Sequence, residues 1–200
     1  MTLPSRRLFV KLCLLVSAGW LTARRAGASQ GLGQFSSGGP PPCKADEKPT
    51  PTAPEGPEFK SGSPERTSLI EPGMTGPKIV LTGTVSGLTC GPIKRARLEF
   101  WQADARGAYD RTGFKLRGHQ FTDATGGYTL ETIVPGSAEK RAPRLHVQVQ
   151  PPGKRAFTTQ LFFPDQPANR SDAQFRPELL LTMTEGRGAR TATFNIVLDI

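Results

Sequence analysis

The chain has 200 residues, a formal net charge of +9 and 36% hydrophobic residues, which suffices for one domain of ordinary size and excludes a large multidomain enzyme. Its 22 Gly and 19 Pro, against 2 Trp, 2 Tyr and 2 His, argue against a helical bundle and leave few residues for His or Tyr chemistry. These are His119, His146, Tyr109 and Tyr128.

Residues 1–28 have the layout of a cleavable export signal. They contain five basic and no acidic residues, and they end in the small residues Ala-Gly-Ala at 26–28 that suit a signal peptidase. The run SRRLFVK at 5–11 is similar to the twin-arginine motif, a receptor-read address for export of folded proteins across the bacterial inner membrane. An ordinary secretory signal with a coincidental arginine pair is the alternative. We expect an exported protein, periplasmic or extracellular, whose mature chain starts near Ser29.

The apolar stretch of this signal is too short for a membrane anchor. It runs from Leu12 to Ala23 and is interrupted by Ser17 and Gly19, whereas crossing a bilayer takes roughly 20 residues. Without residues 1–28, 21 basic and 17 acidic residues remain, a net charge of +4. That surplus is too small to predict a nucleic-acid partner. We therefore expect no stable membrane span and no nucleic acid as a partner.

A Pro/Gly-rich segment follows at residues 29–77. Positions 31–77 hold ten Pro and eight Gly with almost no apolar periodicity, so the segment cannot bury enough surface to order itself. Two interpretations stay open: a flexible tether, or an extended arm laid on the next domain. In both, the predicted domain spans residues 78–200.

The exported chain keeps two cysteines, Cys43 in this segment and Cys90 in an apparent turn, because Cys13 leaves with the signal. In an oxidising compartment a disulfide is the default for such a pair, and closing a loop of about 47 residues would contribute roughly 4 kcal/mol. Two unpaired thiols are the alternative. Metal binding by this pair is not expected, because a structural zinc site needs four ligands.

From Lys78 onward the sequence consists of short β-rich runs separated by Gly, Pro, Asp and Asn, with no helical pattern of ten residues. This pattern predicts an all-β fold, a single antiparallel β-sandwich domain. The predicted strands are residues 79–85, 96–102, 128–133, 145–149, 157–163, 179–183 and 192–198.

Two of these strands alternate cleanly between apolar and polar residues, as half-buried strands do. Their apolar residues predict the core face: Leu98, Phe100, Leu145, Val147 and Val149. Their polar residues predict the opposite, polar face: Arg97, Glu99, His146 and Gln148.

Consecutive blocks of this region resemble the signature of intradiol ring-cleavage dioxygenases. The blocks are LTGTV at 81–85, GPI at 91–93, LEFWQAD at 98–104, GAY at 107–109, LRGHQFTD at 116–123, GY at 127–128, TIVPG at 132–136, RAP at 141–143, TTQLFFP at 158–164 and FNIVL at 194–198. They follow in order, so the resemblance covers residues 78–200. It implies a β-sandwich that opens the ring of a catechol-type aromatic diol with O2, without an organic cofactor.

Members of that family typically bind one Fe(III) through two tyrosinates and two histidines, because hard phenolate oxygens stabilise the ferric state and imidazoles fill the other positions. The resemblance makes Tyr109 the first tyrosine ligand and His146 the second histidine ligand. The second tyrosine position, two residues after the Pro-Gly pair, holds Ala138, and the first histidine position holds Arg144. The expected metal ligands are therefore Tyr109 and His146 alone.

The resemblance also assigns catalytic roles to Arg141 and Gln160, whose positions lie near the substrate, where a guanidinium and an amide stabilise charge developing on the ring. Structural hydrogen bonding across the strands is the alternative for both. Tyr128 or His119 would have to supply the missing ligands, but we interpret Tyr128 as a core residue and His119 as a surface residue or one that supports a ligand.

Two functions stay open. The first is an exported Fe(III)-dependent intradiol dioxygenase whose partners are a small aromatic diol and O2. The second is a catalytically degenerate binding module of the periplasm or envelope that keeps the sandwich but has lost oxygen chemistry. The pair Ala138 and Arg144 separates them, because both stand at ligand positions. The permanent charge of Arg144 repels Fe(III) if it points inward and could instead neutralise Tyr109 or bind an anion.

Overall fold

The computed structural model describes residues 48–56, 58–138, 141–186 and 190–200. The predicted export signal and Cys43 lie outside these ranges. The described residues form β1 (Lys78–Gly87), β2 (Arg97–Gln102), β3 (Arg117–Phe121), β4 (Gly127–Ile133), β5 (Arg144–Gln150), β6 (Phe157–Phe162), the 3-10 helices η1 (Pro167–Arg170) and η2 (Pro177–Leu179), β7 (Thr182–Glu185), β8 (Arg190–Thr193) and β9 (Ile196–Leu198).

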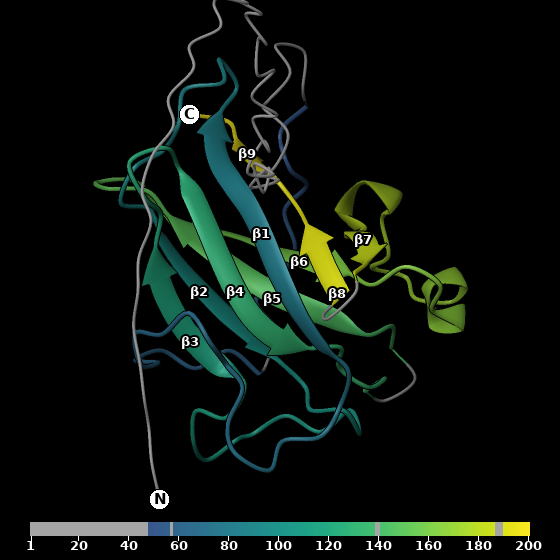
Figure 1. Cartoon of the computed structure of the whole chain (residues 1–200). Coiled ribbons are helices and arrows are strands. Elements are labelled where there is room, and N and C mark those ends of the chain that lie inside the picture. The colour runs from purple at the N-terminus through teal and green to yellow at the C-terminus, as the bar shows by residue number, and fades with distance from the viewer. Residues whose placement is uncertain (1–47, 57, 139–140, 187–189) are drawn as a thin grey trace, which may run out of the picture. The chain divides into compact units, whose positions relative to one another are not determined.

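Two sheets lie one over the other, with β1 and β4 on the near side of Figure 1 and β2, β3 and β5 behind them. The first sheet has the order β4-β1-β8-β7, with β9 also paired to β1, and the second has the order β3-β2-β5-β6. All pairs are antiparallel except those of β1 with β8 and β9. The all-β sandwich predicted from the sequence is confirmed.

The core fills the space between the two sheets. The predicted core face is confirmed, because Leu98, Phe100, Leu145, Val147 and Val149 are all fully buried. They meet apolar side chains of the other sheet in one continuous cluster that includes Ile79, Leu81, Val85, Leu130 and Ile133. Burying such side chains stabilises the fold by about 1.5–3 kcal/mol each.

The outer face of the second sheet differs from expectation, because it is polar but not open to solvent. Glu99 and His146 are each only 2% exposed. Residues 55–56 and 58–66 cover this face: Phe59 packs edge-on against Trp101 at 5.0 Å, and Gln148 donates a hydrogen bond to Glu55. A polar strand face is therefore buried here because another segment of the chain lies on it.

That covering segment belongs to the described part of the predicted arm, residues 48–77. Its backbone bonds to strands of both sheets, from Thr50 N to the Val197 carbonyl at 2.9 Å, Ala53 N to Thr158 at 2.8 Å and Leu69 N to Glu131 at 2.8 Å. From residue 48 on, this segment is an extended layer of the folded unit and not a tether, because its backbone groups find partners on the strands.

The observed strands depart from the predicted ones in three places. The predicted strand 179–183 begins at the end of η2, and only its last two residues lie in β7. The short strand β3 has no apolar alternation and was not predicted, yet it pairs with β2 over five residues. The predicted strand 192–198 divides into β8 and β9, because the Asn195 side chain accepts a hydrogen bond from Thr84 N at 3.1 Å and interrupts the ladder.

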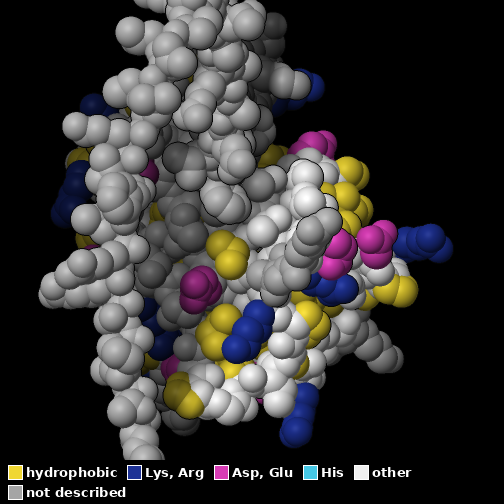
Figure 2. Space-filling model, in the orientation of Figure 1, with side chains coloured by type: hydrophobic (Ala, Val, Ile, Leu, Met, Phe, Trp, Pro, Cys, Tyr) yellow, Lys and Arg dark blue, Asp and Glu magenta, His cyan; other side chains and the backbone are white. Residues whose placement is uncertain are grey.

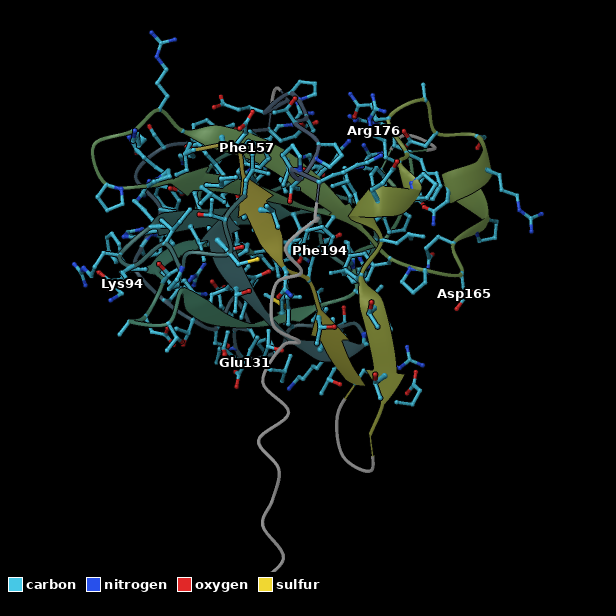
Figure 3. All side chains as sticks on the ribbon, turned by 90° about the horizontal axis from the view of Figure 1, so that it is seen from above. Lys94, Glu131, Phe157, Asp165, Arg176 and Phe194 are labelled. Carbon is cyan, nitrogen blue, oxygen red and sulfur yellow. The ribbon has the colours of Figure 1, made fainter. Side chains whose placement is uncertain are left out.

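Between β6 and β7 the chain makes a long excursion through η1 and η2. Figure 3 shows this excursion, with Asp165 and Arg176, at one side of the sheets and far from Lys94. Figure 2 shows basic, acidic and apolar side chains interspersed over the described part of one face. No helix among the described residues is long and apolar enough to cross a membrane. Cys90 is disulfide-bonded, so the alternative of unpaired thiols is wrong for Cys90.

Candidate active site

Tyr109 is positioned by a tight loop that follows β2. The Asp104 carboxylate accepts hydrogen bonds from the backbone N–H of Arg106 at 2.8 Å and of Ala108 at 3.0 Å, and so closes an Asx-type turn. Gly107 has a φ of +86°, and a Cβ there would collide with the Ser137 carbonyl. The loop therefore needs glycine, because it lies directly against the segment after β4.

A second turn fixes the chain just beyond Tyr109. The Asp110 carboxylate accepts backbone hydrogen bonds from Thr112, Gly113 and Lys115 at 2.8–3.0 Å. These bonds hold the pKa of Asp110 far below its usual range. Arg117 also donates to the Asp110 carbonyl at 2.9 Å. Tyr109 thus projects from a backbone that is held on both sides.

His146 lies on β5, opposite Trp101 of β2 and Gln160 of β6. Its ring stacks on the Trp101 indole, with ring centres 5.1 Å apart and planes 6° apart. Its Nε2 shares a hydrogen bond of 2.9 Å with the Tyr109 hydroxyl. The structure therefore brings together the two residues that the resemblance assigned as metal ligands.

Both of these groups are uncharged at neutral pH. Burial, together with the nearby Glu58 carboxylate, raises the pKa of Tyr109 to about 12, against an opposing effect of Arg144. Burial lowers the pKa of His146 to about 3, and Arg144 and Arg141 act in the same direction. The pair is therefore a neutral phenol bonded to a neutral imidazole.

Arg144 lies beside this pair and is 3% exposed. Its guanidinium donates to the Ala142 carbonyl at 3.1 Å and to Gln160 and Gln174, each at 2.9 Å, and it forms an ion pair with Asp172. It also lies over the Phe162 ring at 5.0 Å. Buried charges need such partners, so these contacts hold Arg144 in place as an integral part of the fold.

Tyr109 and Arg144 face a small cavity of about 210 Å³. The cavity is lined by Glu58, Ala103, Gly107, Ala108, Tyr109, Arg111, Gly136, Ala138, Arg141, Ala142 and Arg144. Of the two predicted catalytic residues, Arg141 lines the cavity and Gln160 does not. Gln160 is 2% exposed and accepts a hydrogen bond from Arg144, which matches its structural alternative. Larger hollows, of 430 and 670 Å³, contain none of the predicted site residues.

The residues present do not fit the ferric site that the resemblance implies. Ala138 offers no donor atom, and Arg144 brings a fixed positive charge where the family has a ligand. The hydroxyl of Tyr109 and Nε2 of His146 bond to each other, so the donor atoms at the two remaining ligand positions are engaged in this hydrogen bond. Within the described ranges, no group of three or more His, Cys, Asp or Glu side chains is placed to hold a metal ion.

Neither substitute ligand reaches the site. Tyr128 is 5% exposed, packs in the core and donates from its hydroxyl to the Phe194 carbonyl at 2.8 Å, which confirms its interpretation as a core residue. His119 lies on β3, where its Nδ1 is 2.8 Å from the Ser63 carbonyl. Sequence reasoning missed Glu58, whose carboxylate lines the cavity and has a buried Oε2 without a hydrogen-bond partner in the described part of the chain.

The two tyrosines should stay protonated far into the alkaline range. Burial raises the pKa of Tyr128 as well as that of Tyr109, and the chain has no other tyrosine. We expect the folded protein to show no tyrosinate absorbance at about pH 10, the ordinary midpoint of tyrosine. The unfolded chain should titrate there with both residues. A step near pH 10 in the folded protein would contradict the raised pKa of these tyrosines.

Burial of His146 should make the fold sensitive to acid. Above about pH 6.5 the imidazole is neutral in both states, so its contribution is constant. As the pH falls toward 3, the His146 imidazole gains a proton in the unfolded chain but stays neutral in the folded one. The free energy of unfolding should therefore fall by up to about 1.4 kcal/mol per pH unit in this range. Denaturant melts of the native chain and of His146→Gln at several pH values measure this fall. The prediction is wrong if the free energy of unfolding depends on pH in the same way in both proteins.

The comparisons with known proteins agree with this architecture. The family model described as "Dioxygenase" matches residues 55–200. Hydroxyquinol 1,2-dioxygenase of Nocardioides simplex is 32% identical, over 54% of this chain and 45% of that protein. Catechol 1,2-dioxygenase of Acinetobacter baylyi is 28% identical, over 63% of this chain and 50% of that protein. The chain thus spans about half the length of these curated relatives.

One solved structure is similar to this chain over nearly the whole length of the solved domain. It is the dioxygenase domain of a dioxygenase carbohydrate-binding protein fusion from Streptomyces sp. SirexAA-E, with 48% identity, a TM-score of 0.74, and coverage of 76% of this chain and 99% of that domain. The family model covers more than half of the chain and the sandwich is shared. The chain therefore belongs to the intradiol ring-cleavage dioxygenase family.

Proposed function

We propose that this protein binds a small molecule in the cavity beside Tyr109 without iron, as a catalytically degenerate member of its family. The observation that carries the proposal is the buried guanidinium of Arg144, which stands where the family has a histidine ligand and is tied to Asp172. A cation that is already paired there stabilises the wall without a metal, whereas Fe(III) beside it would be repelled.

The cavity supports a binding role. Its volume of about 210 Å³ is below the roughly 300–1,000 Å³ of sites for drug-sized ligands, so it suits a molecule with a single ring. The relatives are named for catechol and hydroxyquinol, which are single-ring compounds. With the predicted export signal, we place this binding outside the cytoplasm, in the periplasm or beyond.

One observation favours a second candidate, iron-dependent ring cleavage of a catechol-type diol. The Tyr109 hydroxyl and His146 Nε2 lie 2.9 Å apart at one wall of the site, so two of the four family ligands are in one place. For this candidate the hydrogen bond between them would have to open and Tyr109 would have to lose its proton, against its raised pKa.

Metal content and oxygen consumption distinguish the two candidates. The chain is produced with iron in excess, and its iron content, visible spectrum and O2 uptake with catechol are measured. We expect a colourless, folded protein without stoichiometric iron and without O2 uptake. Near-stoichiometric iron, with a visible band that shifts when catechol is added, would overturn the binding proposal and establish the dioxygenase.

A further inference from the structure

The orientation of His146 depends on a stacking contact. A histidine at a ligand position is usually oriented by a hydrogen bond from its second ring nitrogen. Here Nε2 bonds to the Tyr109 hydroxyl at 2.9 Å, whereas Nδ1 is buried and has no hydrogen-bond partner in the described part of the chain. The plane of the imidazole is therefore fixed by the Trp101 indole, on which it stacks with planes 6° apart.

Trp101 in turn has no polar contact that fixes its ring. It is 1% exposed, and its indole Nε1 is buried without a hydrogen-bond partner among the residues that the structure describes. Its orientation thus depends on packing. The ring of Phe59 packs against it with ring centres 5.0 Å apart and planes 66° apart, an edge-to-face arrangement that aromatic rings favour. Phe59 therefore acts on His146 through Trp101.

The next residue, Lys60, contacts the backbone beyond the other partner, Tyr109. The Lys60 Nζ donates to the Thr112 carbonyl at 2.6 Å and to the Gly113 carbonyl at 3.3 Å, and it lies over the Phe114 ring at 4.4 Å. These three residues belong to the turn that follows Tyr109. Lys60 thereby ties this turn to the extended segment at residues 48–77.

Phe59 and Lys60 lie in a stretch that reaches the second sheet through side chains. From residue 54 to residue 63, the described backbone makes no backbone hydrogen bond to a strand, whereas the N–H groups of Ala53 and Arg66 on either side donate to Thr158 and His119. The side chains of this stretch are therefore what hold it against the site. Two neighbouring residues contact both partners of the Tyr109–His146 pair, each through one intermediate.

We propose that Phe59 and Lys60 are positioning residues that keep the Tyr109 hydroxyl and the His146 imidazole together. Phe59 acts through Trp101, and Lys60 acts through the turn after Tyr109. The extended segment at residues 48–77 thus completes the site in addition to covering the sheet. This inference goes beyond the proposed function, because the geometry of the pair matters to metal-free binding and to iron binding alike.

NMR of the chain with ring-labelled histidine tests the role of Phe59, because the chain has only two histidines, His119 and His146. Protons stacked on the face of an indole are shifted upfield by its ring current, so the His146 ring signals report the stack on Trp101. We expect this upfield shift in the native chain, produced without an added histidine tag. Phe59→Ala should lose more than half of the shift, and Phe59→Tyr, which keeps the edge-on ring, should retain it.

Phe121→Ala is the matched control, because it removes the same side chain from the same face of the sheet. Phe121 packs edge-on against His119, with ring centres 5.8 Å apart. The control should therefore move the signals of His119 and leave those of His146 unchanged.

Ring-labelled tyrosine tests the role of Lys60 in the same way, because Tyr109 and Tyr128 are the only tyrosines of the chain. Lys60→Met keeps the aliphatic stem and removes the N–H donors. It should shift the ring signals of Tyr109 and leave those of Tyr128 in place. Lys94→Met, at an exposed position, should shift neither.

Thermal melting shows which variants are folded. A folded Phe59→Ala variant with native His146 signals would overturn the role of Phe59, and a folded Lys60→Met variant with native Tyr109 signals would overturn that of Lys60. Equal shifts of both histidines, or of both tyrosines, would also overturn the inference, since they indicate a general loosening of the fold. If Phe59→Ala does not fold, Phe59→Leu, which keeps apolar bulk without the ring, is measured by the same criteria.

Discussion

Replacing Ala138 by Tyr and Arg144 by His in one chain is expected to create an iron site. The two changes would complete the donor set around Tyr109 and His146, which already lie 2.9 Å apart. Ala138 lines the cavity, so a phenol at this position has space in front of it. The imidazole at position 144 could donate its second N–H to Asp172, an arrangement that orients metal-bound histidines. We expect the iron content to rise from near zero to about one per chain.

Iron analysis and the visible absorption of the Ala138→Tyr, Arg144→His variant check this prediction. Each single replacement supplies only three protein ligands and should retain less iron, because water must fill the remaining position. Ala138→Phe with Arg144→His is the matched control, because it has the same bulk without the phenol oxygen. A folded double variant that binds no more iron than this control would show that the cavity geometry no longer suits the metal.

Removing the Arg144 side chain is expected to have the largest effect on stability. Arg144→Ala leaves the Asp172 carboxylate buried, with its side chain 4% exposed, and without its cation. It also removes the donors that hold Gln160 and Gln174. Breaking a buried ion pair in this way costs about 3–5 kcal/mol. Urea unfolding of the native chain and the variant measures the difference.

Two control variants accompany the Arg144→Ala measurement: one that removes both charges of the buried pair, and one that breaks an exposed ion pair. Arg144→Met with Asp172→Asn removes both charges and should recover much of the loss, since apolar replacements of buried pairs are often neutral. Arg190→Ala breaks an exposed pair with Glu185, whose side chains are 48% and 73% exposed, and should cost at most about 1 kcal/mol. A loss at Arg144 no larger than at Arg190 would contradict a structural role for this guanidinium.

The central strands could be predicted from the sequence because they alternate between core and opposite face. Leu98 and Phe100 are fully buried, and the predicted strand at 145–149 lies within β5. β3 could not be predicted in this way, since its sequence RGHQF has no apolar period. It is a strand because β2 and residues 64–66 pair with it on both sides, which is tertiary context and not local propensity.

The candidate site was predictable only in part. The order of the blocks that resemble the family located Tyr109, His146 and the two replaced ligands, and the structure brings all four positions to one place. The sequence could not reveal that Arg144 is neutralised. Its partners Asp172 and Gln174 come from the excursion between β6 and β7, which has no periodic pattern. Glu58 comes from a Pro/Gly-rich segment that composition alone describes as disordered.

The extended segment at residues 48–77 also protects the sheets from pairing with other chains. Its residues 64–66 bond to His119 of β3, and its residues 50–53 bond to Thr158 of β6 and Val197 of β9. β3 and β6 are the two edges of their sheet, and unpaired edges are templates for aggregation. A chain shortened to Lys78, where the composition changes, would keep every strand and yet expose both edges. A stretch with little apparent structure in the sequence is thus the one that covers both edges of this sheet.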